Sequence, residues 1–426
     1  MEKKKEPSGI QKAWRQLSIQ NQIFLSMFLI TLLGVGVLMN IVYKTSIDAI
    51  EQNYRASYQS TLKNSSRVMD MNLKNIVDVG RSFLNDEALQ QILEKGNEYG
   101  GSKFTSTDRV KLRVIANEMA VALQKNGKNI YAVGNRTHEK AAAFAEKYGI
   151  GKVYDDFHEM FTDPEVDVIY ITTPHNTHLG FMKEAIANGK HILVEKSITL
   201  NSDELDEAIA LAKEKGVIIG EAMTIYHMPI YKELKKILDS GRLGRVNLIT
   251  MNFGSFKEYN MKNRFFNRNL AGGAMLDIGV YALSFIRWFF DSKPDQLLSQ
   301  VKPAPTGVDE QAGLLLTNQE GQMASVMLSL HSKQPKRGMV SCENGFIEIM
   351  EYPRAWEAKI TDASTGESEI IKAGDNADAL AYELADMERA INGDASAMHL
   401  DYTKDVMDLM TSFRRTWGYT YPEEEK

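Results

Sequence analysis

Apolar residues recur with different periods along this chain, and the change of period divides it. Residues 23–43 form an uncharged apolar run, IFLSMFLITLLGVGVLMNIVY. Over residues 45–94 apolar side chains stand three and four positions apart, which predicts long amphipathic helices. After Asn126, short apolar runs alternate with amphipathic segments. This alternation predicts strands joined by crossover helices, and therefore an α/β protein.

The apolar run at residues 23–43 is long enough, as a helix, to span a hydrocarbon core of ~30 Å. Basic residues stand on its N-terminal side: Lys3, Lys4, Lys5, Lys12 and Arg15. The positive-inside rule therefore predicts a cytoplasmic N-terminus and places the following chain outside. An uncleaved anchor is favoured over a cleaved signal peptide, because the run is long and no clear cleavage site follows Tyr43. We expect a single-pass membrane protein.

The first hundred residues are similar to part of another kind of protein. The segments LSIQNQIFLSMF and SYQSTLKNSSRVMDMNLKNI resemble the membrane anchor and first extracytoplasmic helix of bacterial sensor histidine kinases with a Cache-type domain. This resemblance implies a bacterial cell membrane. Neither a phosphoacceptor-histidine helix nor an ATP-binding domain follows, so kinase activity is not implied.

The segment after Asn126 predicts a parallel sheet covered by helices on both faces. Strands are predicted at residues 129–133, 166–172, 191–195 and 217–221, and helices at 139–148, 177–188 and 203–215. Such a sheet binds ligands at the carboxyl ends of its strands. Asn135 and Arg136 follow the first of these strands, where an NAD-selective enzyme usually has an acid. An amide and a cation instead suit a 2′-phosphate or a stacked adenine, although an exposed arginine at a helix start gives the same pattern.

The loop after the second predicted strand is rich in polar groups. Thr173, Pro174, Asn176 and His178 lie in it, and its side chains can cap the next helix while its amides face a phosphate or ribose. His175-x-x-His178 has the look of a metal pair, but no third ligand stands nearby, so a metal site is not favoured. Glu195 and Lys196 end the third strand, and a charged pair there is unusual unless it faces a site.

From about Val114 onward the chain resembles the Gfo/Idh/MocA oxidoreductases, which include dihydrodiol dehydrogenases. The matching segments are AVGNRTHEKAAAFAEKYGI, DVIYITTPHNTHLGFMKEAIANGKHILVEKSITLN, GRLGRV and GGAMLDIGVYAL. The resemblance implies a Rossmann domain binding NADP or NAD, and then an α+β domain with an open, mainly antiparallel sheet. It also implies a sugar, cyclitol or diol as substrate and a homodimer as the assembly.

By the same resemblance Lys196, Asp277 and Tyr281 are the catalytic residues. The residues themselves agree, since Asp277 and Tyr281 are four apart on an otherwise apolar helix, where an acid needs a partner or a function. Lys196 and Tyr281 can exchange a proton with a substrate oxygen while Asp277 orients them. A structural salt bridge between Lys196 and Asp277 is the alternative. Ser197 replaces the proline of the family motif, and we expect this turn to relax if the family bond is cis.

One expected motif is missing. A dinucleotide domain opens with a strand and a G-x-G-x-x-[GA] loop, yet the sequence has no glycine between Ser102 and Gly127. The residues there continue one helical face instead: Val110, Val114, Ile115, Met119, Ala122 and Leu123. We therefore expect a truncated Rossmann sheet with weakened cofactor binding, in a chain that joins two unrelated fragments. A non-catalytic membrane-anchored sensor is the alternative function.

Composition limits the remaining classes. The chain has 426 residues, 43% hydrophobic and 25% charged, which excludes a mostly disordered protein. A net charge of -6 gives no basic field for nucleic acid, and the single cysteine, Cys342, cannot form an intrachain disulfide. Further strands are predicted at 246–253, 312–316, 323–330, 338–342, 346–350 and 358–361, and helices at 377–392 and 402–417 that return to the first domain. The expected divisions are 1–22, 23–43, 44–113, 114–224 and 225–426.

Overall fold

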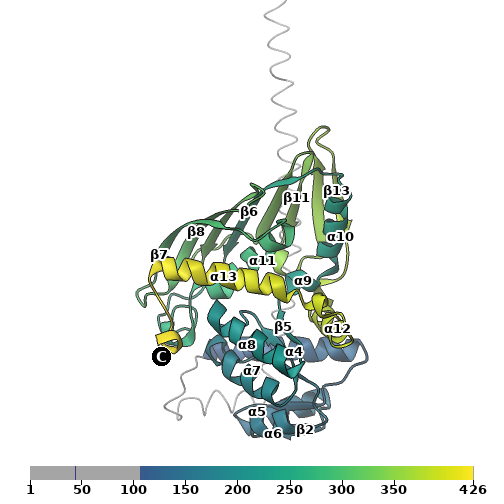
Figure 1. Cartoon of the computed structure of the whole chain (residues 1–426), viewed down its shortest axis with the longest axis vertical. Helices are drawn as coiled ribbons and strands as arrows, with labels where there is room; N and C mark the ends of the chain where they lie inside the picture. Colours follow the sequence, from purple (N-terminus) through teal and green to yellow (C-terminus); the bar gives the residue numbers. More distant parts are fainter. Residues whose placement is uncertain (1–43, 45–105, 426) are drawn as a thin grey trace, which may run out of the picture. The chain divides into compact units, whose positions relative to one another are not determined.

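The computed structural model describes residue 44 and residues 106–425. Residues 106–425 form a nucleotide-binding-type domain and a large sheet domain (Figure 1). The predicted membrane anchor at residues 23–43 and the sensor-like segment up to residue 105 lie outside the described residues, apart from Lys44. Within the described residues, one stretch, Arg268–Phe289, has the length and apolar composition of a membrane span, and 89% of its most apolar 18-residue window is buried inside the protein. Such burial is typical of a core helix.

The first domain alternates short parallel strands with helices. Its strands are β1 (Ala132–Gly134), β2 (Lys152–Tyr154), β3 (Val168–Ile171), β4 (His191–Glu195) and β5 (Ile219–Ala222). Its helices are α4 (Ser106–Lys125), α5 (His138–Tyr148), α6 (Phe157–Thr162), α7 (His178–Ala187) and α8 (Ser202–Lys215). Glycines with positive φ end α5 and α8, at Gly149 and Gly216, as the sequence predicts. The predicted crossover pattern is confirmed, and β2 is a strand that the sequence pattern missed.

The parallel sheet of the first domain is divided in two. Among the described residues β1 pairs only with β2, and β3, β4 and β5 form a separate three-stranded sheet in that order. A doubly wound sheet has the order 3-2-1-4-5-6, so the division falls where its first strand belongs. Among the described residues α4 comes before every strand, so no such first strand is present there. The prediction of a truncated sheet is confirmed for this part of the chain.

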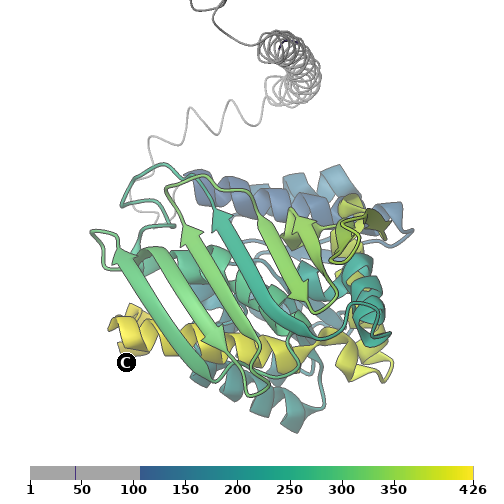
Figure 2. The same ribbon diagram turned by 90° about the horizontal axis from the view of Figure 1, so that it is seen from above.

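The second domain is built on one large sheet. Its strands are β6 (Val246–Gly254), β7 (Gln296–Pro303), β8 (Asp309–Thr317), β9 (Met323–Ser329), β10 (Arg337–Cys342), β11 (Gly345–Met350), β12 (Glu357–Asp362) and β13 (Ser368–Lys372). The 8-stranded order is β13-β12-β11-β10-β6-β9-β8-β7, and every pair is antiparallel except β6 with β9. Helices cover one face, and the described residues leave the other face open (Figure 2). The predicted mainly antiparallel sheet is confirmed.

The helices of the second domain connect it to the first. They are α9 (Thr224–His227), α10 (Pro229–Asp239), α11 (Val280–Phe289), α12 (Ala379–Ile391) and α13 (Leu400–Trp417). Met387 of α12 packs in one apolar cluster with Met119 of α4, and Lys404 and Arg415 of α13 form ion pairs with α8 at Asp206 and Asp203. The predicted return of both helices to the first domain is confirmed.

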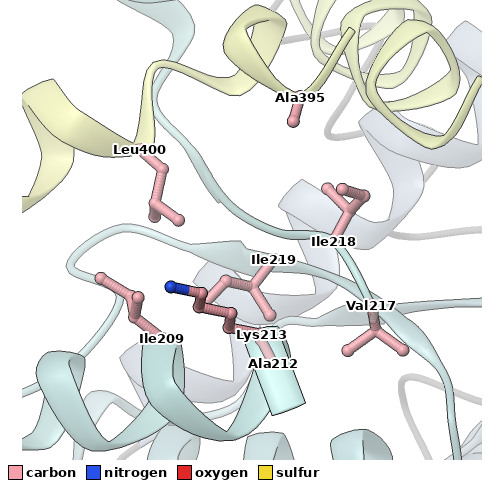
Figure 3. Close-up of a pocket in the computed structure, with 8 residues that line it drawn as sticks. All are labelled: Ile209, Ala212, Lys213, Val217, Ile218, Ile219, Ala395 and Leu400. Atoms are coloured by element: carbon pink, nitrogen blue, oxygen red, sulfur yellow. The ribbon is translucent and has the colours of Figure 1, made fainter. Parts of the chain in front are cut away.

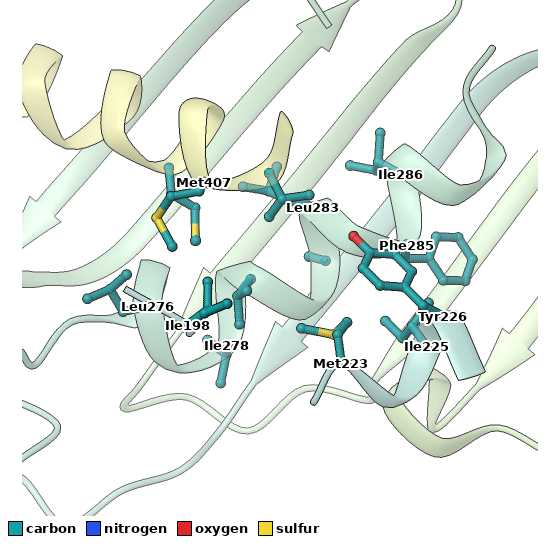
Figure 4. Packing of buried hydrophobic residues seen from close by; sticks show 14 of the residues in the cluster. Ile198, Met223, Ile225, Tyr226, Leu276, Ile278, Leu283, Phe285, Ile286 and Met407 are labelled. Carbon is teal, nitrogen blue, oxygen red and sulfur yellow. The ribbon is translucent and has the colours of Figure 1, made fainter. Parts of the chain in front are cut away.

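A continuous apolar core joins the two domains. Ile198 and Met223 from the first domain pack in the same buried cluster as Leu276, Leu283 and Met407 from the second (Figure 4). Large, dry contacts of this kind hold two domains in a fixed relation, whereas polar interfaces allow them to move. Side chains that meet across this junction are therefore held in place by the core beneath them.

Candidate active site

Lys196, Asp277 and Tyr281 meet at the junction of the two domains. Lys196 follows β4, and its amine donates to the backbone carbonyl of Asp277 at 2.6 Å and to the carboxylate Oδ1 at 3.3 Å. The same amine lies 4.8 Å from the centre of the Tyr281 ring. Lys196 and Asp277 are each 6% exposed. The structure thus brings together the predicted catalytic residues, across 81 residues of sequence.

Asp277 is presented by a wide helical turn. Residues Met275–Gly279 form one π-helical turn that leads into α11. Before it, Gly273 has a φ of 123°, and a Cβ there would lie 2.2 Å from Asp309 Oδ1. The absence of this Cβ lets Asp309 approach and accept a hydrogen bond from the Met275 amide at 2.6 Å. Burial raises the pKa of Asp309 to about 6.

The turn that carries Lys196 is fixed through its backbone. His175 donates to the Lys196 carbonyl at 3.0 Å, and His178 Nδ1 lies 3.1 Å from the carbonyls of both Ser197 and Ile198. The Ile198 amide donates to Glu221 at 3.0 Å. Because each of these partners is buried, the turn has little freedom to move.

Ser197 takes the place of the proline in the family motif without loosening this turn. The Lys196–Ser197 peptide bond is cis. Ser197 is buried, and its hydroxyl donates to the Leu276 carbonyl at 3.0 Å, which ties the turn to the residue before Asp277. Serine thus contributes an interdomain hydrogen bond that proline lacks.

Tyr281 lies beside a group of buried acids. Burial, and then the charge of Glu195, raises the pKa of Tyr281, so its hydroxyl stays protonated and able to donate. Glu195 accepts a hydrogen bond from Tyr170. Glu383 of α12 is fully buried, and neither carboxyl oxygen has a hydrogen-bond partner among the described residues. Burial and the charge of Glu195 hold the pKa of Glu383 well above its usual value.

Two cations of the second domain, Arg264 and Lys257, also lie near Asp277. Arg264 lies 3.1 Å from Asp277 Oδ1, and its guanidinium lies 4.4 Å from the centre of the Phe265 ring. The amine of Lys257 lies 4.2 Å from the centre of the same ring. Burial lowers the pKa of Lys257, and the neighbouring charge of Arg264 lowers it further. Asp277 is therefore surrounded by positive charge from both domains.

The predicted cofactor residues occupy different positions. Asn135 and Arg136 follow β1 and are exposed, with Asn135 Oδ1 accepting from the Thr137 amide at 3.0 Å. Thr173 accepts from the Thr177 hydroxyl at 2.8 Å, and Pro174 comes directly before the turn His175–Thr177. The prediction that side chains of this loop cap the next helix is wrong, because Thr177 at the start of α7 makes no side-chain capping hydrogen bond.

Two residues of that loop have partners that sequence reasoning did not anticipate. Asn176 donates to Glu423 near the C-terminus at 2.8 Å, and its carbonyl oxygen is buried without a partner among the described residues. His178 is fully buried, and its Nε2 lies 2.8 Å from the Thr173 carbonyl. Its ring therefore supports the backbone around Lys196. Among the described residues no group of three potential metal ligands is present.

The residues present fit a nicotinamide dinucleotide in part. The orphaned oxygen of Asn176 offers an acceptor to a ribose hydroxyl, and the exposed Arg136 suits a 2′-phosphate. Glu195 and Lys196 stand at the strand end where the nicotinamide half would lie. The described residues include no glycine loop to cradle the pyrophosphate, because α4 begins directly at Ser106.

Sequence reasoning missed four charged residues near this site. Glu221 interrupts an apolar strand and Glu383 lies on the apolar face of a helix, so a buried acid was a detectable signal at both positions. Lys257 and Arg264 stand in a polar segment with no periodic pattern, where only the fold shows their proximity to Asp277. A small pocket of about 160 Å³ beside Lys213 and Leu400 contains none of the candidate residues (Figure 3).

Comparison with known proteins identifies both domains. Residues 113–223 match a family model described as an oxidoreductase family with an NAD-binding Rossmann fold, and residues 231–348 match the GFO/IDH/MocA C-terminal domain. Trans-1,2-dihydrobenzene-1,2-diol dehydrogenase of Xenopus tropicalis is 31% identical over 239 residues, covering 55% of this chain and 72% of the relative. The mouse enzyme of that name is 26% identical over 328 residues, covering 74% and 98%.

Solved structures share the fold. A 3-ketoreductase from Actinomadura kijaniata, in complex with NADP and TDP-benzene, superposes with a TM-score of 0.62 at 19% identity, over 70% of this chain and 92% of that one. Levoglucosan dehydrogenase, in complex with NADH and levoglucosan, also gives 0.62, at 17% identity over 70% and 95%.

Proposed function

The chain belongs to the GFO/IDH/MocA family of NAD-binding oxidoreductases, and on that premise we propose that it transfers hydride between a nicotinamide and a carbinol carbon. The proposed substrates are sugars, cyclitols or diols, because similar proteins are named as dehydrogenases of a dihydrodiol and of levoglucosan. The observation that carries the proposal is the meeting of Lys196, Asp277 and Tyr281 at the interdomain junction. Because the chain belongs to this family, it is an oxidoreductase of the type that uses NAD or NADP.

The chain's own residues handle the proton. Bound nicotinamide supplies a hydride acceptor at its C4 carbon. In its uncharged form the Lys196 amine takes the proton from the substrate hydroxyl as the carbinol carbon is oxidised, and in the reverse direction its ammonium form returns that proton. The protonated Tyr281 hydroxyl donates to the same oxygen, and the carboxylate and backbone carbonyl of Asp277 hold Lys196 in place. The surrounding apolar core excludes water from the reacting oxygen.

Lys196→Met tests this assignment, because it removes the amine and keeps an apolar stem of similar length. We expect hydride transfer, followed by nicotinamide absorbance with a panel of sugars and diols, to fall by roughly 10²–10⁴. Lys215→Met at the exposed end of α8 is the matched control and should leave the rate unchanged. Equal rates in Lys196→Met and the unaltered chain would remove the proposed role.

Cofactor binding is proposed to be weak. The support is the divided sheet, since neither a first strand nor a glycine loop is present among the described residues. Titration with NADPH, followed by nucleotide fluorescence, tests this, and micromolar binding would reject it. If NADPH binds only weakly while sugars still raise the melting temperature, the alternative function of a ligand-binding sensor without turnover is favoured.

A homodimer is proposed to form through the open face of the large sheet (Figure 2). Large apolar side chains are exposed on its adjacent strands: Leu248, Leu298, Leu315, Met323 and Met327. An apolar face of this kind is typical of a subunit interface. Light scattering should give twice the chain mass for the full chain, and Met327→Lys should lower it to one chain. A monomer before any substitution would contradict the proposal.

A single-pass location in the membrane is proposed from residues 23–43 alone. With basic residues before the run, the catalytic domain is expected on the far side of the membrane from the cytoplasm. Carbonate extraction of cells that express the full chain should leave it in the pellet. A variant with Leu32→Lys and Leu33→Lys should move to the supernatant, because charges at the bilayer centre oppose insertion.

A further inference from the structure

Three cations lie around the carboxylate of Asp277 in the candidate site. Lys196 and Arg264 both contact the carboxylate of Asp277, at 3.3 Å and 3.1 Å. The Lys257 amine and the Arg264 guanidinium lie 4.2 Å and 4.4 Å from the centre of the same Phe265 ring. Lys257 is therefore close to the other two cations. Three cations thus surround one carboxylate, and the single negative charge of Asp277 is already shared by two of them.

Lys257 is the one of these three cations that, in the described part of the chain, forms no ion pair with the carboxylate of Asp277. Among the described residues, no acidic oxygen lies within the 4.0 Å of an ion pair to its amine, which instead faces the nearly buried Phe265. Glu310, an acid of the adjacent strand β8, is already bonded to Lys302 and Tyr259. Lys257 is half-buried, and its pKa is lowered mainly by burial, while the charge of Asp277 raises it from beyond ion-pair distance.

The backbone holds Lys257 in this position. Its amide donates to the Leu330 carbonyl at 2.8 Å, and its carbonyl accepts from His331 at 3.0 Å. These two hydrogen bonds hold the segment against the residues that follow β9. The backbone therefore sets the position of the Lys257 side chain. A fixed, partly desolvated ammonium without a counterion is unfavourable unless a ligand supplies the negative charge.

We propose that the substrate is an anionic sugar or diol, and that its carboxylate or phosphate binds Lys257 beside Arg264. This inference rests on the proposed function, since it takes the reacting hydroxyl to lie between Lys196 and Tyr281. The anionic group then lies toward the sheet domain, and the carbinol carbon lies toward the first domain. Charge-assisted hydrogen bonds of this kind are stronger than neutral ones, so the anion decides which substrates bind.

Binding of matched ligands to the full chain tests the proposal without any cofactor. D-Glucuronate and D-glucose differ in one carboxylate, and glucose 6-phosphate supplies a phosphate on the same ring. By titration calorimetry we expect at least one of the two anionic ligands to bind roughly tenfold or more tightly than glucose, the size of one charge-assisted bond. Equal binding of all three ligands would overturn the inference.

Variants of Lys257 assign the preference to this residue. Lys257→Met should abolish the advantage of the anionic ligand, and Lys257→Arg should retain most of it. Lys262→Met, an exposed lysine on the same segment, is the control and should change nothing. An unchanged preference in Lys257→Met, with an unchanged melting temperature, would overturn the assignment.

Turnover separates this inference from the proposed function. If the anionic ligand binds through Lys257 but no hydride transfer occurs with any sugar, the proposed function fails and the anion site stands. If glucose and the anionic sugars are oxidised with equal kcat/KM, the oxidoreductase function stands and the anion site fails.

Discussion

The amine of Lys196 lies closer to the backbone carbonyl of Asp277, at 2.6 Å, than to the carboxylate of the same residue, at 3.3 Å. A carbonyl cannot be removed by changing a side chain. The position of Lys196 across the domain junction is therefore set by the main chain and by the core beneath it, while the carboxylate supplies charge. These two contributions can be separated by substitution.

We predict that Asp277→Asn folds normally but loses activity. The backbone contact remains, so Lys196 keeps its position, whereas the negative charge that Lys196 and Arg264 share is lost. The expected fall in kcat is roughly 10–10³-fold, with a melting temperature within a few degrees of the original. Steady-state kinetics and calorimetric melting measure the two quantities. A large fall in melting temperature with full activity would instead support a purely structural salt bridge.

We predict a loss of stability with rising pH that comes from Glu221. Burial raises the pKa of this carboxyl to about 7, against an ordinary value of 4.5 for glutamate. Between these two values the folded state binds more protons than the unfolded state, so the free energy of unfolding falls as pH rises from about 4.5 to 7 and is level above. The shift corresponds to roughly 3 kcal/mol.

Glu221→Gln checks this origin, because its amide oxygen can still accept from the Ile198 amide. Urea unfolding at a series of pH values should show a shallower decline in this variant, and its activity should be largely retained. Glu221→Leu should lower activity as well, since the turn that carries Lys196 then loses an acceptor. Glu214→Gln on the exposed face of α8 should behave as the unaltered chain. An identical pH slope in Glu221→Gln would show that other acids, such as Asp309, cause the decline.

We predict that Gly273→Ala is strongly destabilising. The residue has a φ of 123°, and an added Cβ would lie 2.2 Å from Asp309 Oδ1, on the carboxylate whose Oδ2 accepts from the Met275 amide and holds the turn before Asp277. Strain and the displaced hydrogen bond should lower the free energy of unfolding by roughly 2–4 kcal/mol. Gly151→Ala, where no atom lies within 4 Å of the new Cβ, should be nearly neutral. Denaturant unfolding compares the two variants.

The fold was predictable where local chemistry marks each element. β4 has the predicted bounds, because an apolar run there ends in a charged pair, and Gly216 ends α8 as its sequence indicates. β7 and β13 were missed because they are edge strands of the sheet, where polar residues such as Gln300 and Glu369 replace the apolar alternation. Edge strands bury little on either face and therefore carry little signal.

Of the site residues, the sequence predicted only those that belong to the motifs shared with the family. Lys196, Asp277 and Tyr281 were found through the family motifs and the i, i+4 spacing, and the structure brings them together. Lys257 and Glu383 were not found, because their significance depends on what lies beside them. Glu383 interacts with Glu195, far away in the sequence, and no local pattern encodes that proximity.

We predict that a first strand restores cofactor binding. β1 and β3 each have one strand partner among the described residues, so both present unpaired edges toward the place where the first strand of a doubly wound sheet lies. Replacing residues 103–113 with a valine-rich strand and a Gly-x-Gly loop would fill this place and deliver backbone amides to the pyrophosphate at the start of α4. We expect NADPH to bind at least about 100-fold more tightly in this variant, measured by nucleotide fluorescence. The matched control carries the same strand with both loop glycines replaced by valine, and it should gain stability without gaining affinity, since a Cβ blocks the approach of the pyrophosphate. If the control binds NADPH as tightly as the glycine version, the strand alone limits binding. If neither gains affinity, the missing segment does not explain the weak binding that we propose.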